Sequence, residues 1–267
     1  MIDRLRRYGA YACFGLLLLA GSAAAQERMA DAVNRSAHLQ MLTERIARSY
    51  AMLGQAVSAP RTQRQLAADL GAFEGDLAAL RAMPLNPAQQ QNLARVGELW
   101  TGFKSAAGQA PAPAGARVLA RSGAALGAAT ADCTAALRSK VVDRFDAIGL
   151  AGATRTLSQR MAKLYFYATW ELPAPEGAVN FKALEQEFRS ALDKLSIAPQ
   201  NDDSTLADLA LAQSQWVFFS SALAKLGTGE AKQQHMADVG KTSDAMLEVL
   251  EGLAQKYAAS KEQDWAN

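Results

Sequence analysis

The feature that most constrains this chain is an internal repeat of one helical motif. Residues 33–50 (VNRSAHLQMLTERIARSY) align with residues 148–165 (IGLAGATRTLSQRMAKLY) at a constant offset of 115. The identical pairs include Leu42 and Leu157, Arg45 and Arg160, Ala47 and Ala162, and Tyr50 and Tyr165. Similar residues fill most positions between them. We therefore expect two related folding units in which this segment has the same place.

The repeat continues beyond the motif. Phe73, Leu77 and Leu80 align with Phe188, Leu192 and Leu195 at the same offset, and Trp100 and Phe103 align with Trp216 and Phe219 at an offset of 116. The unit of a solenoid spans about 20–50 residues. A repeat of this length instead indicates a duplicated domain.

Prolines and glycines divide the sequence into candidate helices. These cover residues 27–58, 61–83, 87–108, 115–147, 147–172, 176–198, 202–227 and 229–260. No segment alternates apolar and polar residues over the length of a strand. Four helices per copy, joined by short loops, predict an all-α protein of two tandem antiparallel four-helix bundles. The bundles are expected over residues 26–143 and 144–267.

Two structures are possible for the connection between the two predicted bundles. No proline lies between Pro113 and Pro173. The fourth and fifth predicted helices therefore either form one long continuous helix or break near Gly149 and Gly152. A continuous helix would stack the bundles end to end.

Residues 1–25 are typical of a cleaved secretory signal peptide. Three arginines precede an apolar run over residues 10–20, and three alanines at 23–25 form a small-residue cleavage site. The run is short for a membrane span, which needs about 20 residues, although an uncleaved anchor is the alternative. We therefore expect a periplasmic protein. Removing residues 1–25 takes three arginines and one aspartate from the 28 basic and 26 acidic residues, leaving 25 of each, so no net charge favours nucleic acid as a partner.

The residues that usually carry catalysis or metal binding are scarce. No activated serine, paired acids or glycine-rich cofactor fingerprint occurs, and the two histidines, His38 and His235, have no cysteine companions in sequence. Cys133 is the only cysteine after residue 25 and is expected to be a buried apolar side chain. The sequence predicts no enzyme activity, no catalytic residue, no metal and no cofactor.

On a helix, the second copy of the motif presents two contrasting faces. The predicted core stripe is Leu150, Ala153, Leu157, Met161, Leu164 and Ala168, and the opposite face carries Ala151, Gly152, Arg155, Gln159 and Ala162. A second helix could approach the small residues closely, which would desolvate Arg155 and require an acceptor for its guanidinium. The acceptor is either a small anion, held with the help of Ser158 or Gln159, or a carboxylate of a neighbouring helix.

The first copy differs on the same face. Gln40 replaces the arginine and Glu44 replaces the amide, and a glutamate would repel an anion. The second copy is therefore the better candidate for anion binding. The presence of Arg45 and Arg160 in both copies predicts that they share a structural pairing.

The second copy resembles the opening helix of the PilJ-type sensor domain of type IV pili methyl-accepting chemotaxis transducers. It is also similar to the periplasmic motif of nitrate and nitrite sensor kinases. The residues that carry the resemblance are Ala151, Gly152, Arg155, Leu157, Ser158, Gln159, Arg160, Met161, Ala162 and Lys163. Gly149 replaces the asparagine of the pattern and Ala153 replaces its first arginine. The first copy keeps the asparagine as Asn34 but has His38 and Gln40 at the arginine positions.

This resemblance implies a four-helix bundle that binds an anion between paired motif helices through Arg155, with Gly152, Ser158, Gln159 and Arg160 in the site. The paired helices would come from one chain or from a homodimer, and a continuous central helix would favour the homodimer. We expect a non-enzymatic sensor of a small oxyanion such as nitrate or nitrite, which passes its signal to a membrane-bound signalling protein. The alternative is a structural protein that docks a membrane transducer or a type IV pilus component through its motif helices.

Overall fold

The computed structural model describes residues 2–138, 144–172, 180–225 and 231–260. For residues 2–25, 144 and 145 it describes the backbone only. These residues form helices and no strand. The helices are α1 (Ile2–Gly54), α2 (Ala59–Arg81), α3 (Pro87–Ala107), α4 (Pro113–Arg138), α5 (Arg144–Thr169), α6 (Phe181–Ser196), α7 (Asp203–Leu223) and α8 (Ala231–Ala259). The all-α prediction is confirmed.

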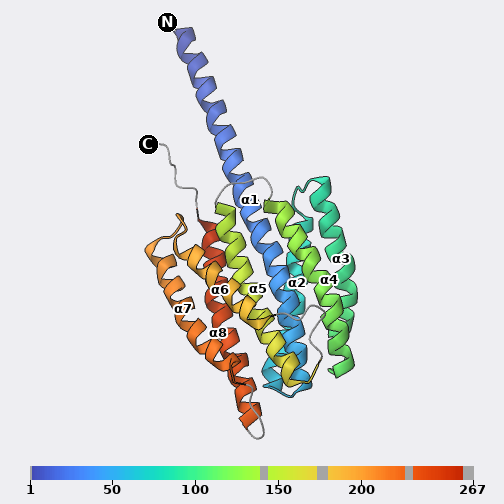
Figure 1. Ribbon diagram of the computed structural model, residues 1–267. Coiled ribbons are helices and arrows are strands. Elements are labelled where there is room, and N and C mark those ends of the chain that lie inside the picture. The colour runs from blue at the N-terminus through green and yellow to red at the C-terminus, as the bar shows by residue number, and fades with distance from the viewer. Residues whose placement is uncertain (1, 139–143, 173–179, 226–230, 261–267) are drawn as a thin grey trace.

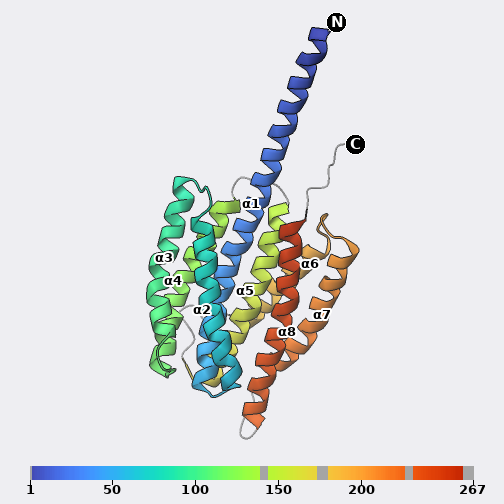
Figure 2. The ribbon, with the colours of Figure 1, turned by 180° about the vertical axis from the view of Figure 1, so that it is seen from behind.

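The helices pack as two antiparallel four-helix bundles that stand side by side (Figures 1 and 2). In the first, α1 packs on α2 and α4, and α3 packs on the same two helices. In the second, α5 and α7 have the same relation to α6 and α8. The most extensive contact between the bundles joins α1 to α5. The two motif helices therefore meet in the middle of the molecule.

The prediction that one continuous helix links the two bundles is wrong. Helix α4 ends at Arg138 and α5 begins at Arg144, and the two run in opposite directions from the same end of the molecule (Figure 1). Arg138 Nη2 donates a hydrogen bond to Asp146 Oδ1 at 2.6 Å, which ties the two helix ends together. Because the bundles lie beside each other, the motif helices meet within one chain and need no dimer to do so.

Local sequence signals account for several helix boundaries. Asn86 caps α3 in a capping box, in which its side chain accepts from the Gln89 backbone and the Gln89 side chain accepts from the Asn86 backbone. Pro87 then occupies the first turn, where its missing N–H is not needed. Asn180 and Asp202 accept backbone hydrogen bonds at the starts of α6 and α7. These short-range contacts explain why α3 and α7 begin within one residue of their predicted starts, whereas α6 begins at Phe181 after a predicted start at 176, and residues 176–179 lie outside the described residues.

The duplication is visible in matched side-chain contacts. Tyr50 and Tyr165 each donate a hydroxyl hydrogen bond of 3.0 Å to a backbone carbonyl, that of Ala110 and that of Lys225 respectively. The aromatic pairs repeat as well, with ring centroids 3.8 Å apart for Phe73 and Trp100 and 4.7 Å apart for Phe188 and Trp216. The copies therefore share an internal architecture, as the sequence repeat predicts.

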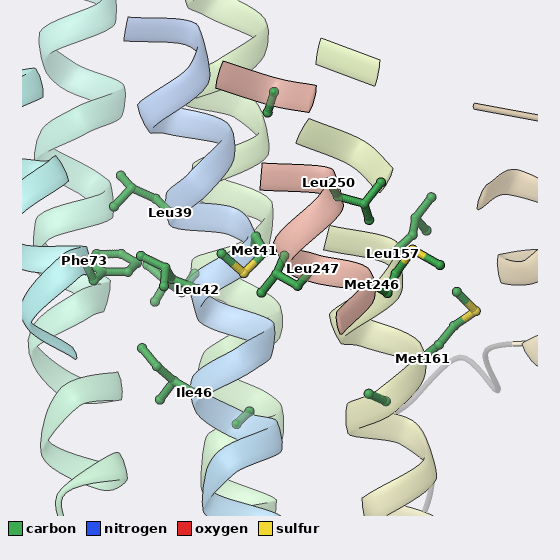
Figure 3. Close-up of a cluster of buried hydrophobic side chains, with 14 of the residues drawn as sticks. Leu39, Met41, Leu42, Ile46, Phe73, Leu157, Met161, Met246, Leu247 and Leu250 are labelled. Carbon is green, nitrogen blue, oxygen red and sulfur yellow. The ribbon is translucent and has the colours of Figure 1, made fainter. Parts of the chain in front are cut away.

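A single hydrophobic core runs through both bundles. Figure 3 shows Leu42 and Ile46 of α1 in the same cluster as Leu157 of α5 and Leu247 of α8, with Phe73 of α2 at its edge. All five side chains are buried. The bundles are therefore fused along α1, α5 and α8.

The fusion buries the opposite face of α5 as well as part of the predicted core stripe, in which Leu157 and Met161 are buried. Ala168 of the predicted core stripe is exposed, whereas Gly152, Arg155 and Gln159 of the opposite face are buried. A Cβ atom on Gly152 would lie 2.5 Å from Cβ of Ala37, closer than two such atoms can approach. The close helix approach predicted for the small residues is confirmed, and the partner is α1.

The contact at Gly152 can be tested with one methyl group. We expect Gly152→Ala to lower the free energy of unfolding by about 1–3 kcal/mol, because the new methyl group forces two packed helices apart. Gly71→Ala is the matched control, since Gly71 is exposed on α2 and its Cβ would meet nothing within 4 Å. That control should stabilise the protein by about 0.5–1 kcal/mol through helix propensity. Urea unfolding followed by circular dichroism measures both; equal changes in the two variants would refute the close approach.

Candidate functional site

Arg155 lies at the centre of the seam between the bundles, with a side chain that is 1% exposed. Its Nη1 donates to Glu251 Oε2 at 2.7 Å. Its Nη2 donates to Asn34 Oδ1 at 2.8 Å and to the Asn34 carbonyl at 3.3 Å. The predicted desolvation of Arg155 is confirmed. In this structure the carboxylate of a neighbouring helix, α8, accepts from the guanidinium.

The contact with Asn34 completes a motif from two copies. The second copy has Gly149 where the PilJ-type pattern has asparagine, and the first copy has Gln40 where the pattern has arginine. Across the seam, Asn34 of α1 meets Arg155 of α5. One asparagine and one arginine are thus brought together by folding, although neither copy has both residues at these two positions.

Glu251 links this pair to a second polar group. Its Oε1 lies 3.4 Å from His38 Nε2, and His38 Nδ1 lies 2.6 Å from Asp76 Oδ2. Asp76 also accepts a hydrogen bond of 2.9 Å from Arg35. The side chains of His38 and Glu251 are each 25% exposed, so this chain of contacts runs from buried Arg155 to the solvent.

Two predicted ligand residues have other partners. Ser158 donates its hydroxyl to the Arg155 carbonyl at 2.8 Å, a bond within its own helix. Gln159 Nε2 donates to the hydroxyl oxygen of Ser243 on α8 at 3.2 Å, and Arg48 Nη1 donates to the same oxygen at 2.8 Å. Both side chains are buried. Gln159 therefore helps to hold α5 against α8.

Arg160 lies on another flank of α5 and bridges to the first copy. Its Nε donates to Glu44 Oε1 at 2.9 Å, and Lys163 forms an ion pair with the other carboxylate oxygen. Burial alone would raise the pKa of Glu44, but the charges of Lys163 and Arg160 outweigh it, and the pKa lies below its ordinary value of 4.5. Glu44 thus acts as the counter-charge for two cations of the second copy.

The prediction that Arg45 and Arg160 share one structural pairing is wrong. Arg45 Nη1 lies 3.4 Å from Asp69 Oδ1 of α2, inside the first bundle. Burial raises the pKa of this aspartate and lowers the pKa of Arg45. Position 184, which corresponds to Asp69 in the repeat, is Leu184. Because the second bundle lacks that acid, Arg160 pairs across the seam.

The five predicted site residues are only partly brought together. Arg155 and Gly152 adjoin at the Ala37 contact, where the Gly152 Cβ position lies 3.7 Å from Arg155 Nη2. Gln159 faces α8, and Arg160 faces Glu44. The acceptor Glu251 was missed, because the sequence carries no signal that links it to α5.

Among the described residues, no group of three or more histidine, cysteine, aspartate or glutamate side chains is arranged to hold a metal ion. None of the helices searched, over the same described residues, has the length and apolar character needed to cross a bilayer. The predicted signal peptide concerns residues 1–25, whose side chains are outside the description. It stays a prediction.

Comparisons with family models, with curated proteins and with solved structures give no match. The resemblance to PilJ-type domains therefore depends on the motif residues alone. What the structure adds is the arrangement of these residues around a buried seam.

The charge cluster around Glu44 predicts a specific pH dependence. Because the folded-state pKa of Glu44 is lowered, its contribution to stability is complete above pH 4.5 and is lost as the pH falls through the folded-state value. We expect Glu44→Gln to lower the free energy of unfolding at pH 7 by about 3 kcal/mol and to flatten its decline below pH 4.5. Urea unfolding across this pH range measures both effects. Glu98→Gln, at an exposed position of α3, should keep the wild-type slope, and an unchanged slope in Glu44→Gln would contradict the assignment.

Proposed function

We propose that this protein is a non-enzymatic periplasmic sensor or ligand-binding protein of the PilJ type, in which a small oxyanion such as nitrate or nitrite binds at Arg155. The observation that carries the proposal is the position of this arginine. It is buried where the two motif helices meet, and it contacts α1 and α8 while belonging to α5. A ligand at Arg155 would act on all three helices of the fused core.

The contacts of Arg155 indicate how an anion would enter. Glu251 occupies Nη1, but its side chain is 25% exposed and so has a path to solvent. The buried Nε of Arg155 has no hydrogen-bond partner. A planar oxyanion in the place of Glu251 could bind Nη1 and Nη2 together, in the bidentate geometry that guanidinium groups favour, and share Nη2 with Asn34. Glu251 would then be displaced.

This exchange supplies a route for a signal. When an anion replaces Glu251, the ion pair that joins α5 to α8 is broken. The freed carboxylate remains beside His38 of α1. Binding would therefore shift contacts between α8 and the motif helices, and a membrane-bound signalling protein could read the altered packing.

Calorimetry with nitrate, nitrite, chloride and sulfate tests this proposal. We expect nitrate or nitrite to bind the wild type and Gln40→Ala, the equivalent position of the first copy, and to lose at least tenfold in affinity for Arg155→Lys, which keeps the charge but not the bidentate fork. Glu251→Gln should strengthen binding, because it removes the competing negative charge. Absence of heat with every anion, in both the wild type and Glu251→Gln, would make Arg155 a purely structural residue.

A second candidate function is the docking of a partner protein, and a specific surface favours it. The motif faces are buried against each other, so a partner cannot reach them in this structure. Helix α7 instead exposes large apolar side chains, namely Leu206, Leu211, Val217 and Phe218, at 44%, 47%, 63% and 62%. The matching positions of α3, at the offset of 116, are Gln90, Arg95, Thr101 and Gly102. The second copy has thus replaced a polar face with an apolar one.

Several large apolar side chains exposed on one helix favour an interaction surface there. The occupant that we propose is a membrane-bound signalling protein, in line with the transducers that carry PilJ-type domains. A second copy of this chain, the expected homodimer, would use the same face.

Photo-crosslinking can identify the occupant of the α7 face. We expect a photo-reactive amino acid in place of Phe218 to give an adduct with a membrane protein in cells, and the same group in place of Gly102 on α3 to give none. Leu211→Arg, which restores the residue of α3, should remove the adduct because it places a charge in the interface. An adduct of twice the chain mass would identify the homodimer instead. Equal labelling from positions 218 and 102 would refute a docking role for α7.

A further inference from the structure

A cavity of about 250 Å³ lies between α1 and α2 of the first bundle and α8 of the second. It is separate from the Arg155 position, and no residue that lines it contacts Arg155 through a hydrogen bond or ion pair among the described residues. The charged side chains of its wall are Arg48, Arg61, Lys241, Asp238 and Asp244. Three cations thus face two carboxylates.

Asp244 is already neutralised within this wall. Arg48 Nη2 donates to its Oδ1 at 2.8 Å, and Arg61 Nη2 donates to its Oδ2 at 3.0 Å. Asp238 accepts a hydrogen bond of 2.9 Å from Gln234. The side chain of Lys241 is exposed, and its ammonium group makes no hydrogen bond or ion pair to any of the described residues. The wall therefore retains an excess of positive charge on the side of Lys241 and Arg61.

Two buried polar atoms of the wall have no partner. Arg48 is 2% exposed and its Nε makes no hydrogen bond, and Ser49 is fully buried and its Oγ makes none. Buried polar groups are nearly always satisfied in folded proteins, and an exception calls for an explanation such as a ligand or ion. Both atoms belong to residues that line the same cavity. This unmet hydrogen-bonding capacity points to a ligand independently of the charge.

We propose that this cavity binds a small organic acid through its carboxylate. The positive excess selects an anion, with Arg61 and Lys241 as the charged donors and Arg48 Nε and Ser49 Oγ as the further donors. The volume favours a ligand larger than an inorganic ion. A water molecule occupies about 30 Å³ in the liquid and pockets for drug-sized ligands begin at about 300 Å³, so a cavity of about 250 Å³ suits a small organic molecule. Gln65 and Gln234, with Met52 on the apolar side, suit the body of an acid of a few carbons.

The place of the cavity gives the ligand a structural effect. Its walls come from both bundles, and the ligand would join Arg61 of α2 to Lys241 of α8. Ser243, next to Asp244, accepts from both Arg48 and Gln159. Occupancy would therefore tighten the contact between the bundles. The inference does not depend on anion binding at Arg155.

Calorimetry on the full chain with succinate and malate, and with inorganic phosphate and nitrate for comparison, tests the inference. We expect an organic acid to bind more tightly than either inorganic ion. Lys241→Ala and Arg61→Ala should each weaken its binding about tenfold, as loss of one charge-assisted hydrogen bond does. Arg64→Ala is the matched control, because Arg64 is exposed on the same helix as Arg61 and does not line the cavity; its affinity should stay within about twofold of the wild type.

The variant Ser49→Ala distinguishes a loss of ligand binding from a loss of folding. Because the hydroxyl has no partner in the protein, its removal should leave the unfolding temperature unchanged while weakening the organic acid several-fold. Arg155→Lys should leave this affinity unchanged, which separates this site from the proposed oxyanion site. The inference is overturned if no organic acid gives heat, if phosphate or nitrate binds more tightly in a manner that depends on Lys241, or if Arg64→Ala weakens binding as much as Arg61→Ala.

Discussion

The contact of α1 with α5 at Ala37 and Gly152 is the constraint on which the other features depend. The two helices approach so closely there that a methyl group added at Gly152 would collide with the Cβ atom of Ala37. The approach buries Arg155, Gln159 and Glu44 in a fused core. Charged groups in such a place are stable only when each has a partner. That requirement explains the partners found at the seam. Arg155 contacts Asn34 and Glu251, Gln159 contacts Ser243, and Glu44 contacts Arg160 and Lys163.

The duplicated bundles have diverged into complementary halves. Asn34 in the first copy meets Arg155 in the second, and Glu44 in the first meets Arg160 in the second. Neither contact joins equivalent positions of the two copies, and the copies differ at two of the positions involved, where Gly149 corresponds to Asn34 and Gln159 corresponds to Glu44. Divergence at the seam therefore stabilises one arrangement of the two bundles, while the conserved tyrosine and tryptophan contacts maintain each bundle separately.

The functional proposals share this geometry. Arg155 and the Arg48 cavity both lie where elements of the first bundle meet α8, so a ligand at either position would act on the contact between bundles. Helix α7, which carries the exposed apolar side chains, lies at the outer edge of the second bundle, away from α1 (Figure 1). The proposed binding of a small anion would thereby affect the relative position of the two halves, and the α7 face is the surface through which we propose that another protein senses it.

The sequence by itself determined the helices, the duplication and the two-bundle fold, because helical periodicity, caps and proline breaks act over a few residues. It also determined that Arg155 would be desolvated and need an acceptor, because small residues flank it at helical spacing. Only the tertiary structure decided that Glu251 is that acceptor, that Arg160 pairs with Glu44, and that the bundles stand side by side. These outcomes depend on contacts between residues about 100 positions apart, for which local patterns carry no information.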